Sequence, residues 1–182
     1  MDYGTPVKIP DGRYYLKTSR DDKRIFIQLN KLAAPSFAEK TLSFQIGDQK
    51  STVQQYEQDI VSKAVESSES WFGRKVSEET IKKAFQSSLS GDQFDTSFVT
   101  LRGEIQTTFF GSDRQPKDKD SDWSQVDVIV ELTGVWFLKK SFGPIFKIVQ
   151  VKESRAPQKK YTSEYLFQDE PEVDEDPNDY LD

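Results

Sequence analysis

The stretch that decides the fold is Val126-Asp127-Val128-Ile129-Val130-Glu131-Leu132-Thr133. Apolar residues occupy every second position from Val126 to Leu132, and successive side chains of a β-strand point to opposite faces. The alternation therefore predicts a strand with one face in the core. A second β-type run covers residues 145–151. Between the two lies Lys139-Lys140-Ser141-Phe142-Gly143-Pro144, which suits a hairpin turn or a short loop.

Further β-type runs occupy residues 25–29, 42–46 and 98–105, and the last extends toward Phe109-Phe110. Helical periodicity separates the second run from the third, because apolar residues recur at three- and four-residue steps over 53–65 and 81–89. Trp71-Phe72-Gly73 closes the first helical segment, since Gly commonly ends helices. Ser77 is the expected N-cap of the next helix. The N-terminal lead, with Gly4-Thr5-Pro6 and Pro10-Asp11-Gly12, is expected to be loop.

This order of elements predicts an α+β fold. The expected architecture is a small, partly open β-barrel of the OB type, with a helical insertion at residues 52–90. A β-sandwich is the competing arrangement. Residues 1–163 would form the OB-like, nucleic-acid-binding domain, and residues 164–182 a disordered acidic tail.

The composition excludes several classes of function. The chain of 182 residues has no Cys and no His, which rules out a thiolate nucleophile, an imidazole base and metal sites built on either residue. We therefore expect a protein that is not an enzyme and needs neither cofactor nor metal. Residues 1–12 lack the order of a signal peptide, and apolar runs such as 135–138 are far shorter than the ~20 residues that span a bilayer. The expectation is a soluble, intracellular protein with no membrane contact.

The charge is divided between two adjacent segments. Residues 164–182 hold nine acids and no Lys or Arg, which leaves 22 acids against 25 cations in residues 1–163, a net charge of +3. Seven of those cations lie between Lys139 and Lys160. Mutual repulsion among the acids predicts a tail that does not fold. The tail could be no more than a solubilising segment, or its end could dock partners through Asp174, Glu175, Asp176, Asp179, Tyr180 and Leu181.

The segment from Trp136 to Lys147 interleaves four aromatic residues with three lysines. Cations that follow the phosphates and flat rings that stack on unpaired bases are what a single-stranded nucleic-acid groove requires. In a purely structural alternative, the rings alternate into the core and the lysines protect a strand edge. Trp136 and Phe137 must point to opposite faces, whereas Phe142, expected in the turn, should be exposed. The candidate binding residues are Trp136, Phe137, Lys139, Lys140, Phe142, Phe146, Lys147 and Lys152.

Two motifs in this region are followed by a linker and the acidic tail: Gly134-Val135-Trp136-Phe137-Leu138 and Phe142-Gly143-Pro144-Ile145-Phe146-Lys147-Ile148-Val149-Gln150-Val151. The arrangement resembles the C-terminal part of OB-fold single-stranded DNA-binding proteins of T7-type phages. It is also similar to small proteins of nucleocytoplasmic large DNA viruses, which Trp71-Phe72-Gly73 and the helix after it would fit. The resemblance implies an OB barrel, a basic aromatic groove for single strands, and an acidic tail that recruits replication proteins. The tail departs from that pattern, because its aromatic residue, Tyr180, is not terminal.

We therefore expect a single-stranded DNA-binding protein that acts in viral DNA replication, recombination or repair. Its partners would be single-stranded DNA and, through a tail that also competes with DNA, replication or recombination proteins; a homodimer is compatible with this role. It would work in the host cytoplasm or nucleus, or be packaged in virions. The alternative is a structural or adaptor protein, such as a minor virion component, that binds protein through the same hairpin. A carboxylate-metal nuclease is set aside, because Asp92, Asp95 and Glu104 lack metal-ligand spacing.

Overall fold

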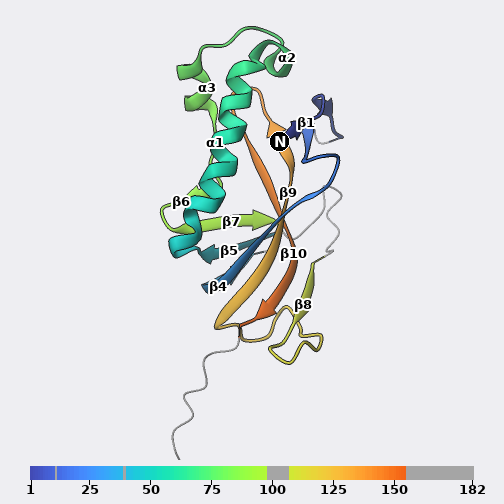
Figure 1. Ribbon diagram of the computed structural model, residues 1–182, viewed down its shortest axis with the longest axis vertical. Helices are drawn as coiled ribbons and strands as arrows, with labels where there is room; N and C mark the ends of the chain where they lie inside the picture. The colour runs from blue at the N-terminus through green and yellow to red at the C-terminus, as the bar shows by residue number, and fades with distance from the viewer. Residues whose placement is uncertain (11, 39, 98–106, 155–182) are drawn as a thin grey trace, which may run out of the picture.

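The computed structural model describes residues 1–10, 12–38, 40–97 and 107–154. These residues form ten strands and three α-helices, so the protein is mostly β-sheet and the α+β class is confirmed. In Figure 1, α1 lies along one side of the sheet, α2 and α3 lie at one end of the molecule, and β8 lies toward the other. The expected tail, residues 164–182, and the expected strand at 98–105 lie outside the described residues.

The strands begin and end as follows: β1 Asp2–Tyr3, β2 Val7–Lys8, β3 Tyr14–Ser19, β4 Ile25–Phe37, β5 Thr41–Gln45, β6 Leu89–Ser90, β7 Gln93–Ser97, β8 Thr108–Phe110, β9 Gln125–Phe137 and β10 Phe142–Glu153. Between β5 and β7 the chain forms a 3-10 turn, Gly47–Gln49, and the helices α1 Lys50–Glu66, α2 Ser68–Phe72 and α3 Glu78–Ala84. The helices expected within residues 52–90 are present, but they end at Ala84, and Leu89–Ser90 forms β6 instead of continuing the last helix. Gly4-Thr5-Pro6 lies outside the strands, as expected, but the N-terminal lead is not all loop, because β1 and β2 both pair with β3.

Five of the strands pair in a ring. β9 pairs antiparallel with β4 and with β10, β4 pairs with β5, and β5 pairs with β7. β7 returns to β10 through a parallel pairing with Lys147 opposite Ser97. The successive neighbours are therefore β4, β5, β7, β10 and β9. Outside the ring, β3 pairs with the end of β9 that β4 does not reach, and β8 runs parallel to β10.

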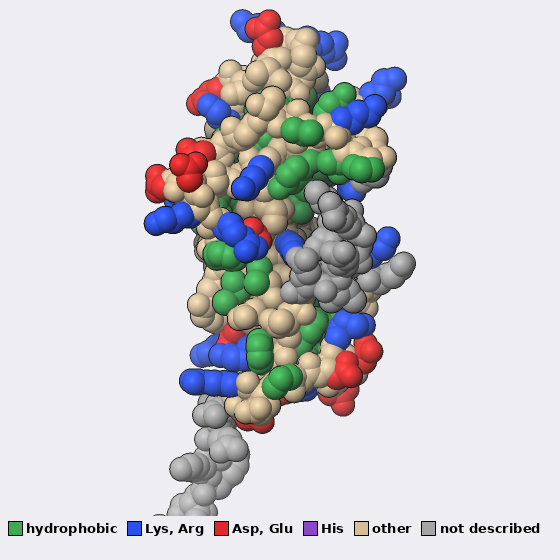
Figure 2. All heavy atoms as spheres, turned by 90° about the vertical axis from the view of Figure 1, so that its right-hand side faces the viewer, with side chains coloured by type: hydrophobic (Ala, Val, Ile, Leu, Met, Phe, Trp, Pro, Cys, Tyr) green, Lys and Arg blue, Asp and Glu red, His purple; other side chains and the backbone are tan. Residues whose placement is uncertain are grey.

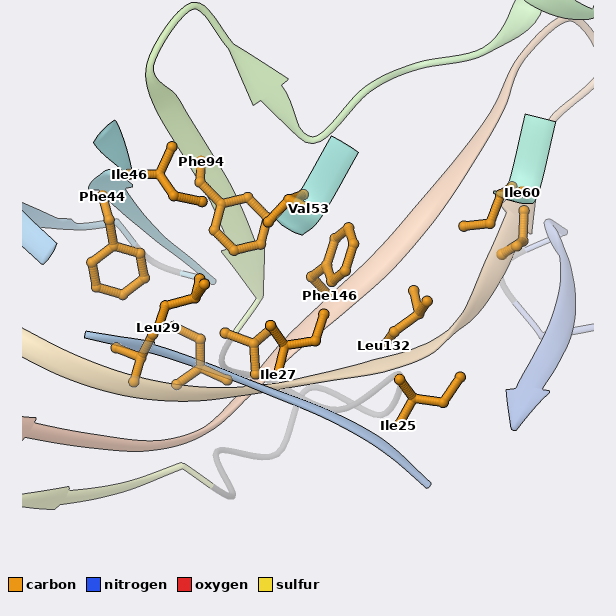
Figure 3. Packing of buried hydrophobic residues seen from close by; sticks show 14 of the residues in the cluster. Ile25, Ile27, Leu29, Phe44, Ile46, Val53, Ile60, Phe94, Leu132 and Phe146 are labelled. Carbon is orange, nitrogen blue, oxygen red and sulfur yellow. The ribbon is translucent and has the colours of Figure 1, made fainter. Parts of the chain in front are cut away.

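The core lies inside this ring and under α1. The predicted alternation of β9 is confirmed, because Val126, Val128, Val130 and Leu132 are at most 1% exposed. Figure 3 shows Phe44, Phe94 and Phe146 directed into the space that α1 covers with Val53 and Ile60. The rings of Phe94 and Phe146 meet edge to face with centroids 5.2 Å apart, an arrangement that aromatic pairs favour.

The helical insertion ends and restarts at the residues expected. Gly73 follows α2 with a φ of 69°, a left-handed conformation that costs a glycine little. Ser77 precedes α3, and its Oγ accepts a hydrogen bond from the Thr80 backbone N–H at 3.4 Å. The bend between α2 and α3 turns Phe72 and Phe85 toward the start of β10, where both rings contact Phe142.

Candidate nucleic-acid interface

All eight predicted binding residues lie on the hairpin of β9 and β10. The two strands pair from Phe137 opposite Phe142 down to Val126 opposite Glu153. The turn is shorter than expected: it spans residues 138–141, closed by a 2.8 Å hydrogen bond from the Leu138 N–H to the Ser141 carbonyl oxygen. Because the strands are pleated, the register divides the predicted residues between the two faces of the sheet.

Three predicted aromatic residues face the core. Phe137, Phe142 and Phe146 are 6%, 0% and 3% exposed. Phe137 and Phe142 stack on each other with ring planes 11° apart. The prediction that Phe142 is exposed is wrong, because this residue is not in the turn but is the first residue of β10. As placed, none of these three rings can stack on a nucleic-acid base.

The other five predicted residues are outside the core. Lys139 and Lys140 are exposed in the turn, Lys152 is exposed near the end of β10, and Trp136 and Lys147 are half-buried on the outer face of the sheet. Trp136 lies opposite Gly143. Its indole occupies the space over that glycine, since a Cβ there would be 3.2 Å from the indole Nε1.

The structure adds two aromatic residues to this face that the sequence did not indicate. Tyr15 in β3 lies opposite Trp136, and Phe26 in β4 lies opposite Glu131, which in turn lies opposite Lys147. Phe26 is 50% exposed. The ring of Tyr15 covers Gly134, where a Cβ would be 2.6 Å from Tyr15 Cε2. Its hydroxyl donates a 2.6 Å hydrogen bond to the Thr133 carbonyl oxygen, and burial raises the pKa of Tyr15.

Cations accompany the outer aromatic residues. Lys17 is exposed in β3, opposite Gly134. The guanidinium of Arg24 lies over the ring of Phe26, 5.0 Å from its centroid. Arg24 Nε donates to Glu131 Oε1 at 2.7 Å, and this hydrogen bond raises the pKa of Arg24 above its usual value. Arg24 therefore makes a cation–π contact with Phe26, while its charge is partly neutralised by Glu131.

A second charged pair lies farther along the same face. Lys152 Nζ is 3.0 Å from Asp127 Oδ2. Burial alone would raise the pKa of Asp127, but hydrogen bonds from Ser154, the Lys31 backbone N–H and Lys152 outweigh it and lower the pKa. Lys152 is therefore partly neutralised by its neighbour. Its contribution to any phosphate contact should be smaller than that of Lys139 or Lys140.

Beyond the turn of the hairpin is a cleft with a volume of about 940 Å³. Its walls come from the residues that precede β3, from α2 and α3, and from the ends of β9 and β10. Arg74, Lys139 and Lys140 are among the lining residues, and none of the described lining residues is acidic. In Figure 2, hydrophobic side chains gather in the upper part of the face shown, with Lys and Arg side chains beside them.

Membrane-spanning helices and carboxylate metal sites are both absent from the part of the chain that the structure describes. No helix there is long and apolar enough to cross a membrane. Within the same residues, no group of three or more acidic side chains is placed to hold a metal ion.

Residues 30–169 match the model of a protein family, DUF5871, which is described as a family of unknown function. The chain belongs to this family. The DUF5871 match begins within β4 and includes the whole β9–β10 hairpin, the three helices and the turn residues Lys139 and Lys140. It excludes Tyr15, Arg24 and Phe26. No curated protein and no solved structure matches the chain.

Proposed function

We propose that this DUF5871 protein is a non-enzymatic single-stranded DNA-binding protein that acts in viral DNA replication, recombination or repair. The observation that carries the proposal is the outer face of the β9–β10 hairpin and its neighbours β3 and β4. On this face Tyr15, Trp136 and Phe26 alternate with Lys17, Arg24 and Lys147. Single-stranded nucleic acid is bound by such combinations, because rings stack on unpaired bases while cations follow the phosphates.

The ring of strand pairings supports an OB-type barrel as the scaffold. An OB fold is a five-stranded, partly open barrel, and the ring of β4, β5, β7, β10 and β9 has five members with one parallel pair. In this interpretation, β9 and β10 are the last two strands of the barrel. The turn with Lys139 and Lys140 is then the loop between the last two strands, one of the loops that bind oligonucleotides in OB folds.

The charge distribution argues for the β9–β10 side of the ring over the opposite side. The outward positions of β5 and β7 include Ser43, Gln45, Gln93 and Asp95, and none of the outward positions of these two strands is aromatic or cationic. Ser43 Oγ and Gln93 Nε2 both donate hydrogen bonds to Asp95. A carboxylate and amides would neither stack on bases nor attract phosphates. DNA should therefore follow the face that carries Trp136.

The acidic tail, residues 164–182, is proposed to compete with DNA and to recruit replication or recombination proteins. The argument is electrostatic: nine acids on one tether are held near cations that would otherwise contact phosphates, at an effective concentration on the order of millimolar. Removal of residues 169–182 should raise affinity for single strands at low salt, and the difference should disappear as salt shortens the Debye length. An unchanged low-salt affinity would leave the tail only its docking role.

The proposal is tested by fluorescence titration of the full chain with oligo-dT and with the corresponding duplex. Trp136 is the intrinsic reporter on the proposed face, whereas Trp71 and Trp123 lie elsewhere. Single strands should bind more tightly than duplex, because stacking requires unpaired bases, and Trp136→Phe should remove most of the fluorescence change while it retains binding. Equal affinity for oligo-dT and duplex would reduce the interaction to general electrostatic attraction and overturn the proposal.

A further inference from the structure

The cleft beyond the hairpin turn is chemically unlike the outer sheet face. Most of its lining side chains are apolar, from Trp71, Ile81 and Ala84 on the helices and Val76 between α2 and α3 to Phe137 and Phe142 on the hairpin. Tyr14 and Leu138, two of the four large hydrophobic residues that are exposed in the described part of the chain, line it and are 47% and 53% exposed. Exposed apolar side chains gathered at one hollow mark an interaction site.

The aromatic residues of the cleft are poorly arranged for stacking on bases. The ring of Phe142 is stacked on Phe137 and receives the edges of Phe72 and Phe85. Trp71 meets Phe137 edge to face at 5.6 Å. Phe142, Phe137 and Trp71 are at most 9% exposed, so they close the cleft with an apolar wall in which no flat ring face is open to a ligand. A branched or aromatic side chain fits such a wall better than the flat face of a nucleobase.

Cations approach the cleft from two directions. Arg74 belongs to the connection between α2 and α3, whereas Lys139 and Lys140 belong to the hairpin turn, and all three are exposed. With no acid among the described lining residues, the cleft attracts negative charge on both sides of an apolar interior. A ligand that matches this pattern carries a bulky apolar group between negative charges.

We propose that this cleft docks an acidic segment of another polypeptide. One bulky apolar side chain of the partner inserts between Leu138 and the helices, and carboxylates on its two sides pair with Arg74 and with Lys139 or Lys140. Acidic motifs are recognised by clustered cations in this way, and a buried apolar anchor supplies most of the affinity. The docking site shares Lys139 and Lys140 with the proposed DNA-binding turn, but Arg74 lies outside both that turn and the outer sheet face, so the two roles can be tested separately.

The test measures fluorescence anisotropy of a labelled twelve-residue peptide, with a Phe between two pairs of Asp, added to the full chain. Two control peptides replace the Phe by Ser or the four Asp by Asn. Binding should fall at least about tenfold with either control peptide, and with the Arg74→Ala or Leu138→Glu protein, because each change removes a charged contact or the apolar anchor. Arg74 and Leu138 are exposed, so both variants should fold.

The matched variant is Lys152→Ala, which removes one exposed cation from the outer sheet face, and its peptide affinity should equal that of the wild type. Oligo-dT affinity is measured for the same proteins. Arg74→Ala should bind oligo-dT as the wild type does, so its loss of peptide binding is separable from failure of the DNA-binding proposal. If Arg74→Ala loses oligo-dT binding and oligo-dT displaces the peptide, the cleft belongs to the nucleic-acid site and the proposal is overturned.

Two other results would also overturn it. Equal binding of the Phe and Ser peptides would show attraction by charge alone, without an apolar anchor. The chain's own tail is the competing occupant, and it is tested with a variant in which the eight acids from Asp169 to Asp182 are replaced by their amides. Peptide binding that is absent in the wild-type chain and appears only in this variant would assign the cleft to the tail.

Discussion

The inner and outer faces of the β9–β10 hairpin are built from the same kinds of residue and have opposite roles. On the inner face, Phe137 and Phe142 are buried against each other and against the helices. On the outer face, Trp136 is half-buried and lies opposite Tyr15, and Lys147 lies farther along β10. The role of an aromatic residue in this hairpin is therefore set by the face of the sheet on which it lies, not by its type. The inner rings should determine stability and the outer rings binding.

The variant with the largest expected effect on the inner face is Phe142→Ala. Removal of a fully buried ring should lower the free energy of unfolding by about 3–5 kcal/mol, because a cavity remains between Phe72, Phe85 and Phe137. Urea unfolding measures the loss. At a temperature where the variant is folded, its oligo-dT affinity should be close to that of the wild type.

The control for this variant is Leu138→Ala, an equally apolar truncation four residues away at a site that is 53% exposed. It should change stability by no more than about 0.5 kcal/mol. A Phe142→Ala protein with normal stability and weakened DNA binding would reverse the assignment of the two faces.

The outer rings provide the complementary test. Trp136→Ala and Tyr15→Ala should each weaken oligo-dT binding by about 1–3 kcal/mol, since each removes one stacking surface. Tyr15→Phe keeps the ring and removes only the hydrogen bond to the Thr133 carbonyl oxygen, so its affinity should be unchanged. Isothermal titration calorimetry of the three variants measures the effects. Loss of affinity in Tyr15→Phe equal to that in Tyr15→Ala would show that the hydroxyl, not the ring, is what DNA needs.

The lysines of the hairpin test whether the outer face and the turn bind phosphates. A triple variant should weaken binding to all sequences; it combines Lys139→Ala, Lys140→Ala and Lys147→Ala. It should also reduce the slope of log affinity against log salt by about 0.7 for each phosphate that the protein no longer neutralises. The matched triple variant is Lys63→Ala, Lys82→Ala and Lys83→Ala on α1 and α3, where each lysine pairs with a glutamate of its own helix. Both variants lose three positive charges. An equal change of slope in both would mean that DNA responds to net charge alone.

The smallest expected effect concerns pH. The pKa of Asp127 in the folded protein lies below its usual value of 3.8, so the stability that this carboxylate contributes is present above about pH 4. It is lost as pH falls through the lowered pKa, where the folded carboxylate takes up its proton. Asp127→Asn lacks this contribution at every pH. The difference in unfolding free energy between wild type and variant should therefore shrink on acidification below pH 4, whereas a constant difference would contradict the assignment.

Much of the fold follows from local patterns. The alternation in β9, the N-cap at Ser77 and the helix end at Gly73 depend on residues close together in sequence, and all three are confirmed. The N-terminal strands could not be predicted from local patterns, because β3 pairs with a strand near the other end of the chain. Tyr15 and Thr133, which are joined by a hydrogen bond, are 118 positions apart. No local pattern in 14–19 indicates which strand it will join.

The candidate site could be predicted as a segment but not as a surface. The interleaved rings and lysines point to the hairpin, yet a shift of one residue in the pairing register of a strand moves every side chain to the other face. The turn ends at Ser141 instead of Pro144, and this places Phe142 in the core. Tyr15, Arg24 and Phe26 join the site only through pairing with β9, so composition around the hairpin could not reveal them.

The central position of β9 has a consequence for how the chain is made. β3, β4 and β10 all pair with β9, and Arg24 and Glu131, which form an ion pair, are 107 positions apart. During synthesis, β3 and β4 leave the ribosome long before the strand that joins them has been translated. Contacts between such distant residues slow folding, and a nascent chain with unpaired strands is prone to aggregate. A product that ends before Gln125 would keep these strand edges exposed and should accumulate in insoluble form.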